Sequence, residues 1–363
     1  MPLPVPYVWS ESSTRHVPGA EVWVGVRTPG TEVAERALAI RDALEAAGSP
    51  RVKAVAHDDE LLYRVHDRGL LDHLRTAYDA WVAAGYPDDP GQDRVVPYVF
   101  PTEGLLAGLG PRVPTAIHAR AGRYCYDTMT LVGPGTWEGA RGAVDVALTA
   151  ADLVASGADP IAYALCRPPG HHAGRDAFGG SCYLNNAAIA AEALRAAGHE
   201  RVAVIDLDAH HGNGTQALFY GRGDVLYGSV HVDPGSGWFP HFVGFAEETG
   251  RGEGVGANAN LPLAPGTGDD GWLDAVAGLA DAARRHRATA MVVSLGVDAA
   301  VDDPESPLAV TRAGYREAGR RLGALGLPTV AVQEGGYHLP TLGDLVVAGL
   351  AGLAEGHADT VGG

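Results

Sequence analysis

The chain has 363 residues, of which 46% are hydrophobic and 20% charged, a composition typical of a globular protein with a large core. Its formal net charge of −17 argues against nucleic acid as a partner and mildly favours cationic ligands. The three cysteines form no CxxC pair, the N-terminal segment lacks a signal-peptide layout, and no apolar run approaches the ~20 residues of a membrane span, so we expect a cytoplasmic protein with no disulfide framework and no membrane partner.

The first part of the chain has the weaker secondary-structure pattern. Apolar positions at helical spacing predict helices over residues 31–48 and 70–85. The next segment, residues 86–116, is rich in proline and glycine and predicts a long loop. Because a structureless stretch of this length is unusual inside a compact domain, we expect the 86–116 loop to be a lid, a binding loop or the interface of a homodimer.

From residue 135 onward, helical patterns alternate with short apolar runs. Apolar runs predict strands at residues 161–165, 201–208, 224–232, 288–298 and 328–336. Helical spacing predicts helices at residues 135–157, 185–198, 270–286 and 312–326, with a helical turn at 215–220. Unbroken apolar strands separated by helices indicate an α/β fold, with a mostly parallel β-sheet and helices on both faces. No linker or repeat divides the chain, so we expect one domain over residues 1–363.

Polar residues follow two of these strands at their carboxyl ends, where α/β sheets bind ligands. The strand at 201–208 ends at Asp208, two positions before His210, and residues two apart in an extended segment point the same way. The strand at 288–298 ends at a second carboxylate, Asp298. Three nitrogen and oxygen ligands with an open position are what a catalytic divalent metal requires. Zn²⁺ is the leading candidate, and the Asp-rich set also suits Fe²⁺ or Co²⁺.

Two further motifs lie after predicted strands. "RPPGHHA" contains the adjacent pair His171 and His172, and "EGGY" ends at Tyr337. Each motif alone has an ordinary explanation, because loop carbonyls can satisfy a histidine pair and "EGGY" is a common turn sequence. Four such features after successive strands favour a single active site over chance.

The motifs "RPPGHHA", "DLDAHHGNGTQ", "SLGVDA" and "EGGY", in this order, resemble the arginase-like metal-dependent deacetylases. That superfamily includes the histone deacetylases and the acetylpolyamine amidohydrolases. The segments "VHDRGLLDHL", "PGTWEGA", "GDVLYGSVHVDP" and "FPHFVGFAEETG" are most similar to the bacterial acetylpolyamine amidohydrolases. The resemblance covers most of the chain and implies the arginase/deacetylase fold.

The resemblance also implies roles for individual residues. Asp208, His210 and Asp298 would hold zinc, and His172 would act as general base, paired with Asn213. His171, hydrogen-bonded to Asp206, would give electrostatic support, and Tyr337 would donate a hydrogen bond to the oxyanion. A neutral partner such as Asn213 leaves His172 free to be a neutral base, whereas Asp206 favours the charged form of His171.

A structural potassium ion is a second implication of the resemblance. The residues carried over to it are Asp206, Asp208 and His210, together with Ser229 and the carbonyl group of Val230. The alternative is that Ser229 binds no ion and is simply a residue at the end of a strand.

The sequence departs from the family pattern where the family's tunnel has aromatic walls. One aromatic follows the second glycine of the "GG" pair, but here Ser181 follows Gly180. The other wall survives as Phe239, or as Trp238. We therefore expect a tunnel that is wider or more polar on one side.

A second departure concerns the carboxylate that receives distal ammonium groups in acetylpolyamine amidohydrolases. The corresponding position here is His118, which is a poor substitute for a glutamate. Glu305, in "DDPES", takes a rim position and could compensate. The resemblance implies an amidohydrolase that removes an acetyl group from a small cationic amine. The alternatives are a protein acetyl-lysine deacetylase and, more remotely, a non-catalytic binding protein on the same scaffold.

Overall fold

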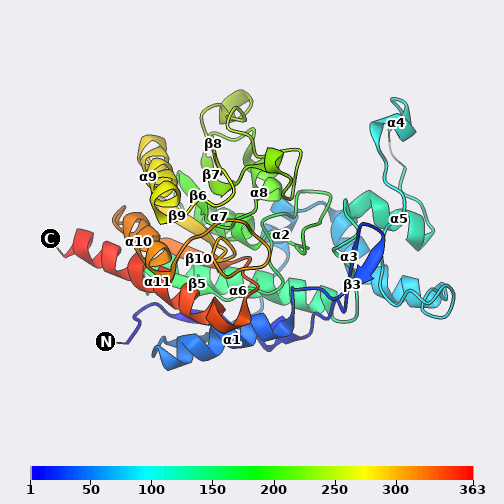
Figure 1. The fold of residues 1–363 in the computed structure, drawn as a ribbon, viewed down its shortest axis with the longest axis horizontal. Coiled ribbons are helices and arrows are strands. Elements are labelled where there is room, and N and C mark those ends of the chain that lie inside the picture. The colour runs from blue at the N-terminus through cyan, green and yellow to red at the C-terminus, as the bar shows by residue number, and fades with distance from the viewer. Residues whose placement is uncertain (1, 111, 363) are drawn as a thin grey trace.

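The computed structural model describes residues 2–110 and 112–362, which fold around one parallel β-sheet (Figure 1). The sheet has eight strands in the order β4-β1-β5-β10-β9-β6-β7-β8, and every neighbouring pair is parallel. The strands are β1 (Tyr7–Trp9), β4 (Arg51–Lys53), β5 (Ile161–Ala164), β6 (Val202–Asp206), β7 (Val225–Val232), β8 (Asn258–Leu263), β9 (Ala290–Leu295) and β10 (Thr329–Gln333). A separate antiparallel hairpin pairs β2 (Glu21–Trp23) with β3 (Val26–Thr28).

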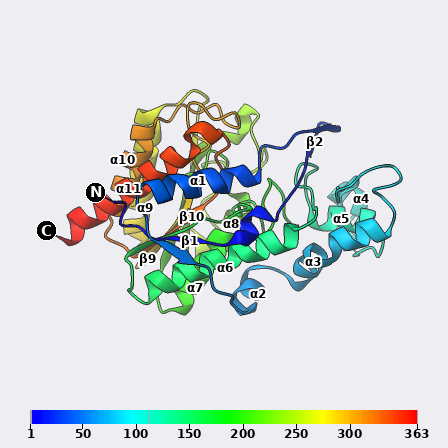
Figure 2. The same ribbon diagram turned by 90° about the horizontal axis from the view of Figure 1, so that it is seen from below.

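Helices cover both faces of the sheet, as the sequence predicts. The helices are α1 (Ala34–Ala46), α2 (Glu60–Val65), α3 (Arg68–Ala83), α4 (Glu103–Leu106), α5 (Ile117–Tyr124), α6 (Thr136–Ala155), α7 (Asn186–Ala196), α8 (Asn213–Phe219), α9 (Asp269–His286), α10 (Arg312–Gly323) and α11 (Leu339–Val361). Figure 2 shows α1 and α11 on one side of the strands and α6 and α7 on the other. The α/β fold class is confirmed.

The two faces of the sheet bury two separate hydrophobic cores, because successive strand residues point to opposite faces. Val204 of β6 belongs to the core that contains α3, α6 and α7, whereas its neighbour Ile205 belongs to the core that contains α1, α9, α10 and α11. All five residues of β6 are buried. This double coverage explains why the central strands appear in the sequence as unbroken apolar runs.

The five strands expected from residue 161 onward are all present, but the sheet also has three that the sequence pattern did not indicate. β1 and β4 have three residues each, which is too short for a period to appear. β8 is an edge strand with the sequence NANLPL, and its polar residues and proline are typical of sheet edges. The β2–β3 hairpin was also missed.

Helix α11 is a long apolar helix that the sequence patterns did not single out. By length and composition alone, its residues Leu339–Val361 could cross a membrane. The helix instead packs against α10 and α1. Of its most apolar stretch of 18 residues, 56% is buried inside the protein. Its composition is that of a core helix.

The proline- and glycine-rich segment 86–116 contains one short helix, α4. Figure 1 shows α4 and α5 at the end of the molecule away from the C-terminus. The segment is attached to the body through the bridge between Val95 and Val132 and through the hydrogen bond from Trp81 Nε1 to the carbonyl of Gln92, at 2.7 Å.

Candidate active site

Two neighbouring strands bring the three expected metal ligands together. Asp208 and His210 follow β6, and Asp298 follows β9, which pairs with β6 in parallel register. One ligand atom from each of the three residues lies within 4.8 Å of the others. His210 Nδ1 is 3.2 Å from Asp208 Oδ1 and 3.1 Å from Asp298 Oδ2.

Backbone amides orient both carboxylates. Gly335 N–H donates to Asp208 Oδ2 at 2.7 Å, and Ala209 N–H donates to Asp298 Oδ1 at 2.7 Å. A Cβ at Gly335 would lie only 2.3 Å from Asp298 Oδ2, so the close approach of this backbone requires glycine.

The charges of this group indicate a cation. Burial, followed by the negative charge of Asp208, raises the pKa of Asp298 to about 7. Two fully buried carboxylates with a histidine nitrogen beside them are a donor set that suits a divalent metal ion. The residues present therefore fit the metal that the sequence predicts.

The two adjacent histidines have different partners. His171 Nδ1 lies 3.1 Å from Asp206 Oδ2. Burial opposes protonation of His171, but the charges of Asp208 and Asp206 outweigh it and raise the pKa of this imidazole to about 10. The neighbouring carboxylates therefore favour the charged form of His171.

The surroundings of His172 favour its neutral form instead. Asn213 is the first residue of α8, and its Oδ1 lies 2.7 Å from His172 Nδ1. Burial, followed by the charges of His171 and His210, lowers the pKa of His172 well below its usual range. Because an amide oxygen accepts from Nδ1–H, the free lone pair is on Nε2.

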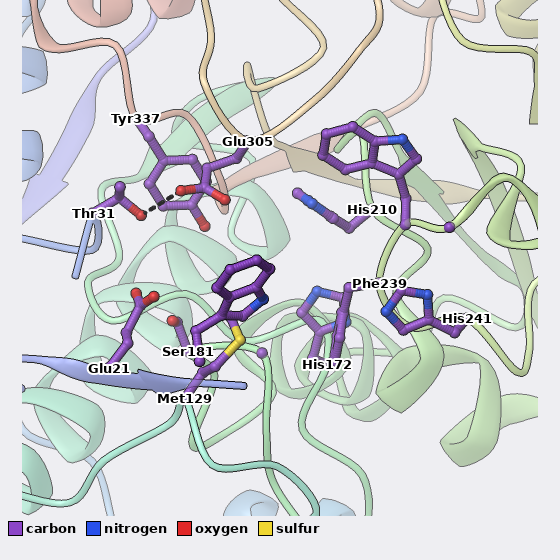
Figure 3. Close-up of a pocket in the computed structure, with 14 residues that line it drawn as sticks. Glu21, Thr31, Met129, His172, Ser181, His210, Phe239, His241, Glu305 and Tyr337 are labelled. Atoms are coloured by element: carbon purple, nitrogen blue, oxygen red, sulfur yellow. Dashed lines mark hydrogen bonds between the residues drawn. The ribbon is translucent and has the colours of Figure 1, made fainter. Parts of the chain in front are cut away.

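Tyr337 extends into the same space from the loop after β10 (Figure 3). Its backbone N–H donates to Asp303 Oδ2 at 2.6 Å, and the guanidinium carbon of Arg36 lies 4.6 Å from its ring centroid. Burial raises the pKa of the phenol well above its usual range. Tyr337 is therefore a hydrogen-bond donor at neutral pH.

A buried glutamate that the sequence patterns did not single out supports the histidine pair. Glu334 Oε2 accepts hydrogen bonds from the backbone amides of Gly170 and His171, at 2.7 and 3.1 Å. Glu334, His171 and Cys182 also lie close enough to form a second possible metal group. However, burial raises the pKa of the Cys182 thiol well above its usual range, which disfavours the thiolate that a metal would bind. The "EGGY" motif contains Glu334, but the amides of Gly170 and His171 that donate to it are 164 and 163 positions away in the chain.

A pocket of about 510 Å³ connects these groups to the surface (Figure 3). The expected site residues that line it are His172, Gly180, Ser181, His210, Trp238, Phe239, Glu305 and Tyr337. The sequence patterns did not indicate the other lining residues: Glu21, Trp23, Thr31, Met129, Gly237 and His241.

Phe239 supplies the aromatic wall that the sequence led us to expect. The ring centroid of Phe239 lies 4.8 Å from that of His172, in an edge arrangement. On the other side, Gly180 has a φ of 57° and its backbone passes so close to His172 that a Cβ would lie 2.3 Å from Cδ2. Ser181 follows it and is a small polar residue at the position where the family pattern has an aromatic.

The two candidates for ammonium recognition lie in different places. Glu305 lines the pocket and accepts a hydrogen bond from Thr31 Oγ1 at 2.9 Å. His118 does not line this pocket; it lies in α5, where its Nδ1 is hydrogen-bonded to the hydroxyl of Tyr86 and its ring lies 5.8 Å from that of Tyr98. Because α5 lies apart from the strand ends that form the site, substrate binding by His118 stays a prediction.

The residues expected at a potassium site are also neighbours. Parallel register pairs Asp206 of β6 with Ser229 of β7, and Val230 follows Ser229. The Ser229 hydroxyl lies 2.7 Å from His231 Nδ1, and Asp206 Oδ1 accepts from the amide of Asp208 at 3.2 Å. Potassium binding at these residues stays a prediction.

Comparison with known proteins adds independent findings. Residues 30–353 match the family model described as "Histone deacetylase domain". An acetylpolyamine amidohydrolase from Mycoplana ramosa is 42% identical over 348 residues, which are 96% of this chain and 99% of the relative. Acetylpolyamine amidohydrolase 1 from Pseudomonas aeruginosa is 41% identical over 357 residues, with 97% and 99% of the two chains covered.

The solved structures give the same result. The crystal structure of an acetylpolyamine aminohydrolase from Burkholderia pseudomallei has a TM-score of 0.90 at 40% sequence identity, and the match covers 98% of this chain and 99% of that one. The HDA15 HD domain has a TM-score of 0.74 at 27% identity. The family expected from the motifs is confirmed.

Proposed function

The chain belongs to the histone deacetylase family and is a hydrolytic deacetylase, and we propose that it removes the acetyl group from a small cationic amine of the acetylpolyamine class. The observation that carries this proposal is the carboxylate of Glu305 in the same pocket as His172 and Tyr337. A distal ammonium on the substrate would meet this charge while the acetamide lies at the floor of the pocket.

Three side chains account for the proton transfers and the charge that develops. Neutral His172 removes a proton from the attacking water through Nε2, while Asn213 fixes the tautomer by accepting from Nδ1–H. Tyr337 donates a hydrogen bond from its hydroxyl to the carbonyl oxygen as that oxygen becomes negative, and keeps its proton. His172 then returns the proton to the amine nitrogen as the C–N bond breaks, which yields acetate and the free amine.

The family is metal-dependent, and Asp208, His210 and Asp298 are the residues that would hold the ion, with Zn²⁺ as our proposal and Fe²⁺ or Co²⁺ as alternatives. Such an ion would polarise the acetyl carbonyl and lower the pKa of the attacking water. Asp206, Asp208, His210, Ser229 and the carbonyl of Val230 would hold a structural K⁺.

The remaining parts of the proposal concern partners and location. The 86–116 segment is our candidate for a homodimer interface, since among its described residues none lines the pocket of its own chain. A partner's segment would then limit access to small substrates and disfavour proteins. We also propose a cytoplasmic location, with no nucleic-acid or membrane partner.

The test is a comparison of substrates on zinc-loaded enzyme. Acetate release is measured with a monoacetylated diamine, a monoacetylated triamine and an acetyl-lysine peptide at equal concentrations. We expect kcat/KM to be at least about tenfold higher for the acetylated polyamines, in line with the worth of a partly solvated ion pair. A preference for the peptide would support protein deacetylation, and no turnover by enzyme with full metal content would support a non-catalytic scaffold.

A further inference from the structure

The orientation of the Asn213 side chain decides which ring nitrogen of His172 carries the proton. Its amide has a carbonyl oxygen that accepts and an NH2 group that donates, and the two are similar in size and shape. With the oxygen facing His172 Nδ1, that nitrogen carries the proton and Nε2 has the free lone pair, whereas the NH2 group in its place would reverse this. The oxygen lies 2.7 Å from Nδ1. A base that accepts its proton at Nε2 therefore requires that the Asn213 amide stay in this orientation.

Tyr126 contacts both the Asn213 side chain and the backbone of His172. Its hydroxyl donates to the carbonyl oxygen of His172 at 2.9 Å, and Asn213 Nδ2 lies 3.3 Å from the same hydroxyl oxygen. A phenol has one proton and a backbone carbonyl can only accept, so this proton is given to His172. The hydroxyl oxygen is left as an acceptor, and the group of Asn213 that faces it has to be the NH2 group. These contacts therefore turn the carbonyl oxygen of Asn213 toward His172 Nδ1.

The surrounding chain holds Tyr126 in place. Tyr126 follows α5, and its backbone N–H donates to the carbonyl of Phe178 at 3.1 Å. The ring passes close to Gly179, where an added Cβ would lie 2.3 Å from Tyr126 Cε2, so this position requires glycine. The ring is also nearly parallel to that of Phe239, with an interplanar angle of 13° and centroids 6.4 Å apart. The Tyr126 hydroxyl is thus kept beside Asn213.

We propose that Tyr126 is a positioning residue that fixes the tautomer of His172 through the side-chain amide of Asn213. This inference rests on the proposed function, in which His172 is the base. Tyr126 is not among the residues that line the pocket, so it acts through Asn213 and not on the substrate. Without the hydroxyl, the Asn213 amide can turn over and present its NH2 group to Nδ1. The proton of neutral His172 would then be on Nε2, and this nitrogen could no longer accept a proton from water.

The first test is Tyr126→Phe on zinc-loaded enzyme, which removes the hydroxyl and retains the ring. We expect kcat to fall several-fold, up to about tenfold, with little change in KM, because an orienting hydrogen bond is lost and no substrate contact. The matched control is Tyr183→Phe, which also removes a hydroxyl that donates to a backbone carbonyl, that of Leu131 at 2.6 Å. The control should keep its kcat even if its melting temperature falls. An unchanged kcat in Tyr126→Phe would overturn the proposal.

A double-variant comparison separates control of the tautomer from general support of the loop. In Asn213→Asp, the carboxylate offers only acceptors, so it receives the Nδ1–H group of His172 in either orientation and donates nothing to Tyr126. Adding Tyr126→Phe to Asn213→Asp should therefore change kcat by less than about twofold relative to Asn213→Asp alone. A loss as large as the one in the wild-type background would show that Tyr126 supports the loop and does not act through the Asn213 amide.

The protonation of His172 supplies a readout that does not depend on turnover. In zinc-loaded protein with nitrogen-15-labelled histidine, the chemical shifts of the two ring nitrogens report which one carries the proton, and the spectrum of His172→Ala identifies the signals of this residue. The wild type should have the proton on Nδ1, and Tyr126→Phe should have a substantial fraction on Nε2. This response in a wild type that deacetylates no amine would overturn the proposed function alone. A His172 tautomer that is unchanged in Tyr126→Phe would overturn the role of Tyr126 alone.

Discussion

The floor and the rim of the pocket are built in different ways. At the floor, the side chains of Asp208 and Asp298 are fully buried, and their oxygens are oriented by backbone amides of neighbouring strand ends. At the rim, Glu21, Trp23 and Glu305 belong to a hairpin and a loop, and Trp23 is largely exposed. We therefore expect the residues at the strand ends to determine the reaction and the peripheral segments to determine which amine is accepted.

The largest expected effect is at the floor. Asp298→Ala should remove the metal and lower turnover by about 10³-fold or more, because a Lewis acid is worth several kcal/mol of transition-state stabilisation. Metal content by elemental analysis and acetate release are the measurements. Asp302→Ala, which removes an exposed carboxylate four positions on, should change neither. Full metal retention in Asp298→Ala would exclude this residue from the site.

His172 tests whether the floor also contains a protein base. His172→Ala should lower kcat by roughly 10²–10⁴-fold, since it removes proton transfer. Asn213→Ala removes one hydrogen bond that orients the ring and should cost about tenfold or less. Small and equal losses in steady-state kinetics of the two variants would show that His172 is not the base.

Tyr337 tests the oxyanion contact. Tyr337→Phe should lower kcat by roughly 10²–10³-fold with little change in KM, because the phenol acts mainly on charge that develops in the transition state. Tyr78→Phe, on the remote helix α3, serves as the control. An unchanged kcat for Tyr337→Phe would mean that another group donates this hydrogen bond.

The smallest effect is expected at the rim. Glu305→Leu should reduce the ratio of kcat/KM for an acetylated polyamine to that for a neutral acetyl-lysine peptide by about tenfold, and rising salt should reduce the same ratio in the wild type. The exposed residue Glu138, replaced by leucine, is the control. Equal changes in kcat/KM for both substrates would show that Glu305 is an ordinary surface charge with no role in substrate selection.

Local patterns in the sequence are sufficient for the central part of the molecule. The runs at 201–208 and 288–298 are apolar because their strands are buried on both faces, and ligand residues directly follow them. Parallel strands end at the same edge of a sheet, so the sequence by itself groups Asp208, His210 and Asp298. The roles of His172, Asn213 and Tyr337 come from resemblance to a family, and the match over residues 30–353 confirms that family.

Only the tertiary structure decided the edges of the sheet and the rim of the pocket. Strands of three residues such as β1 and β4 have no readable period, and they form because partners in the sheet complete their hydrogen bonds. Thr31 and Glu305 are 274 positions apart yet hydrogen-bonded, and nothing in either local sequence indicates the other. Periodicity reports which face of an element is buried, whereas the meeting of a hairpin with a distant loop depends on how the whole chain packs.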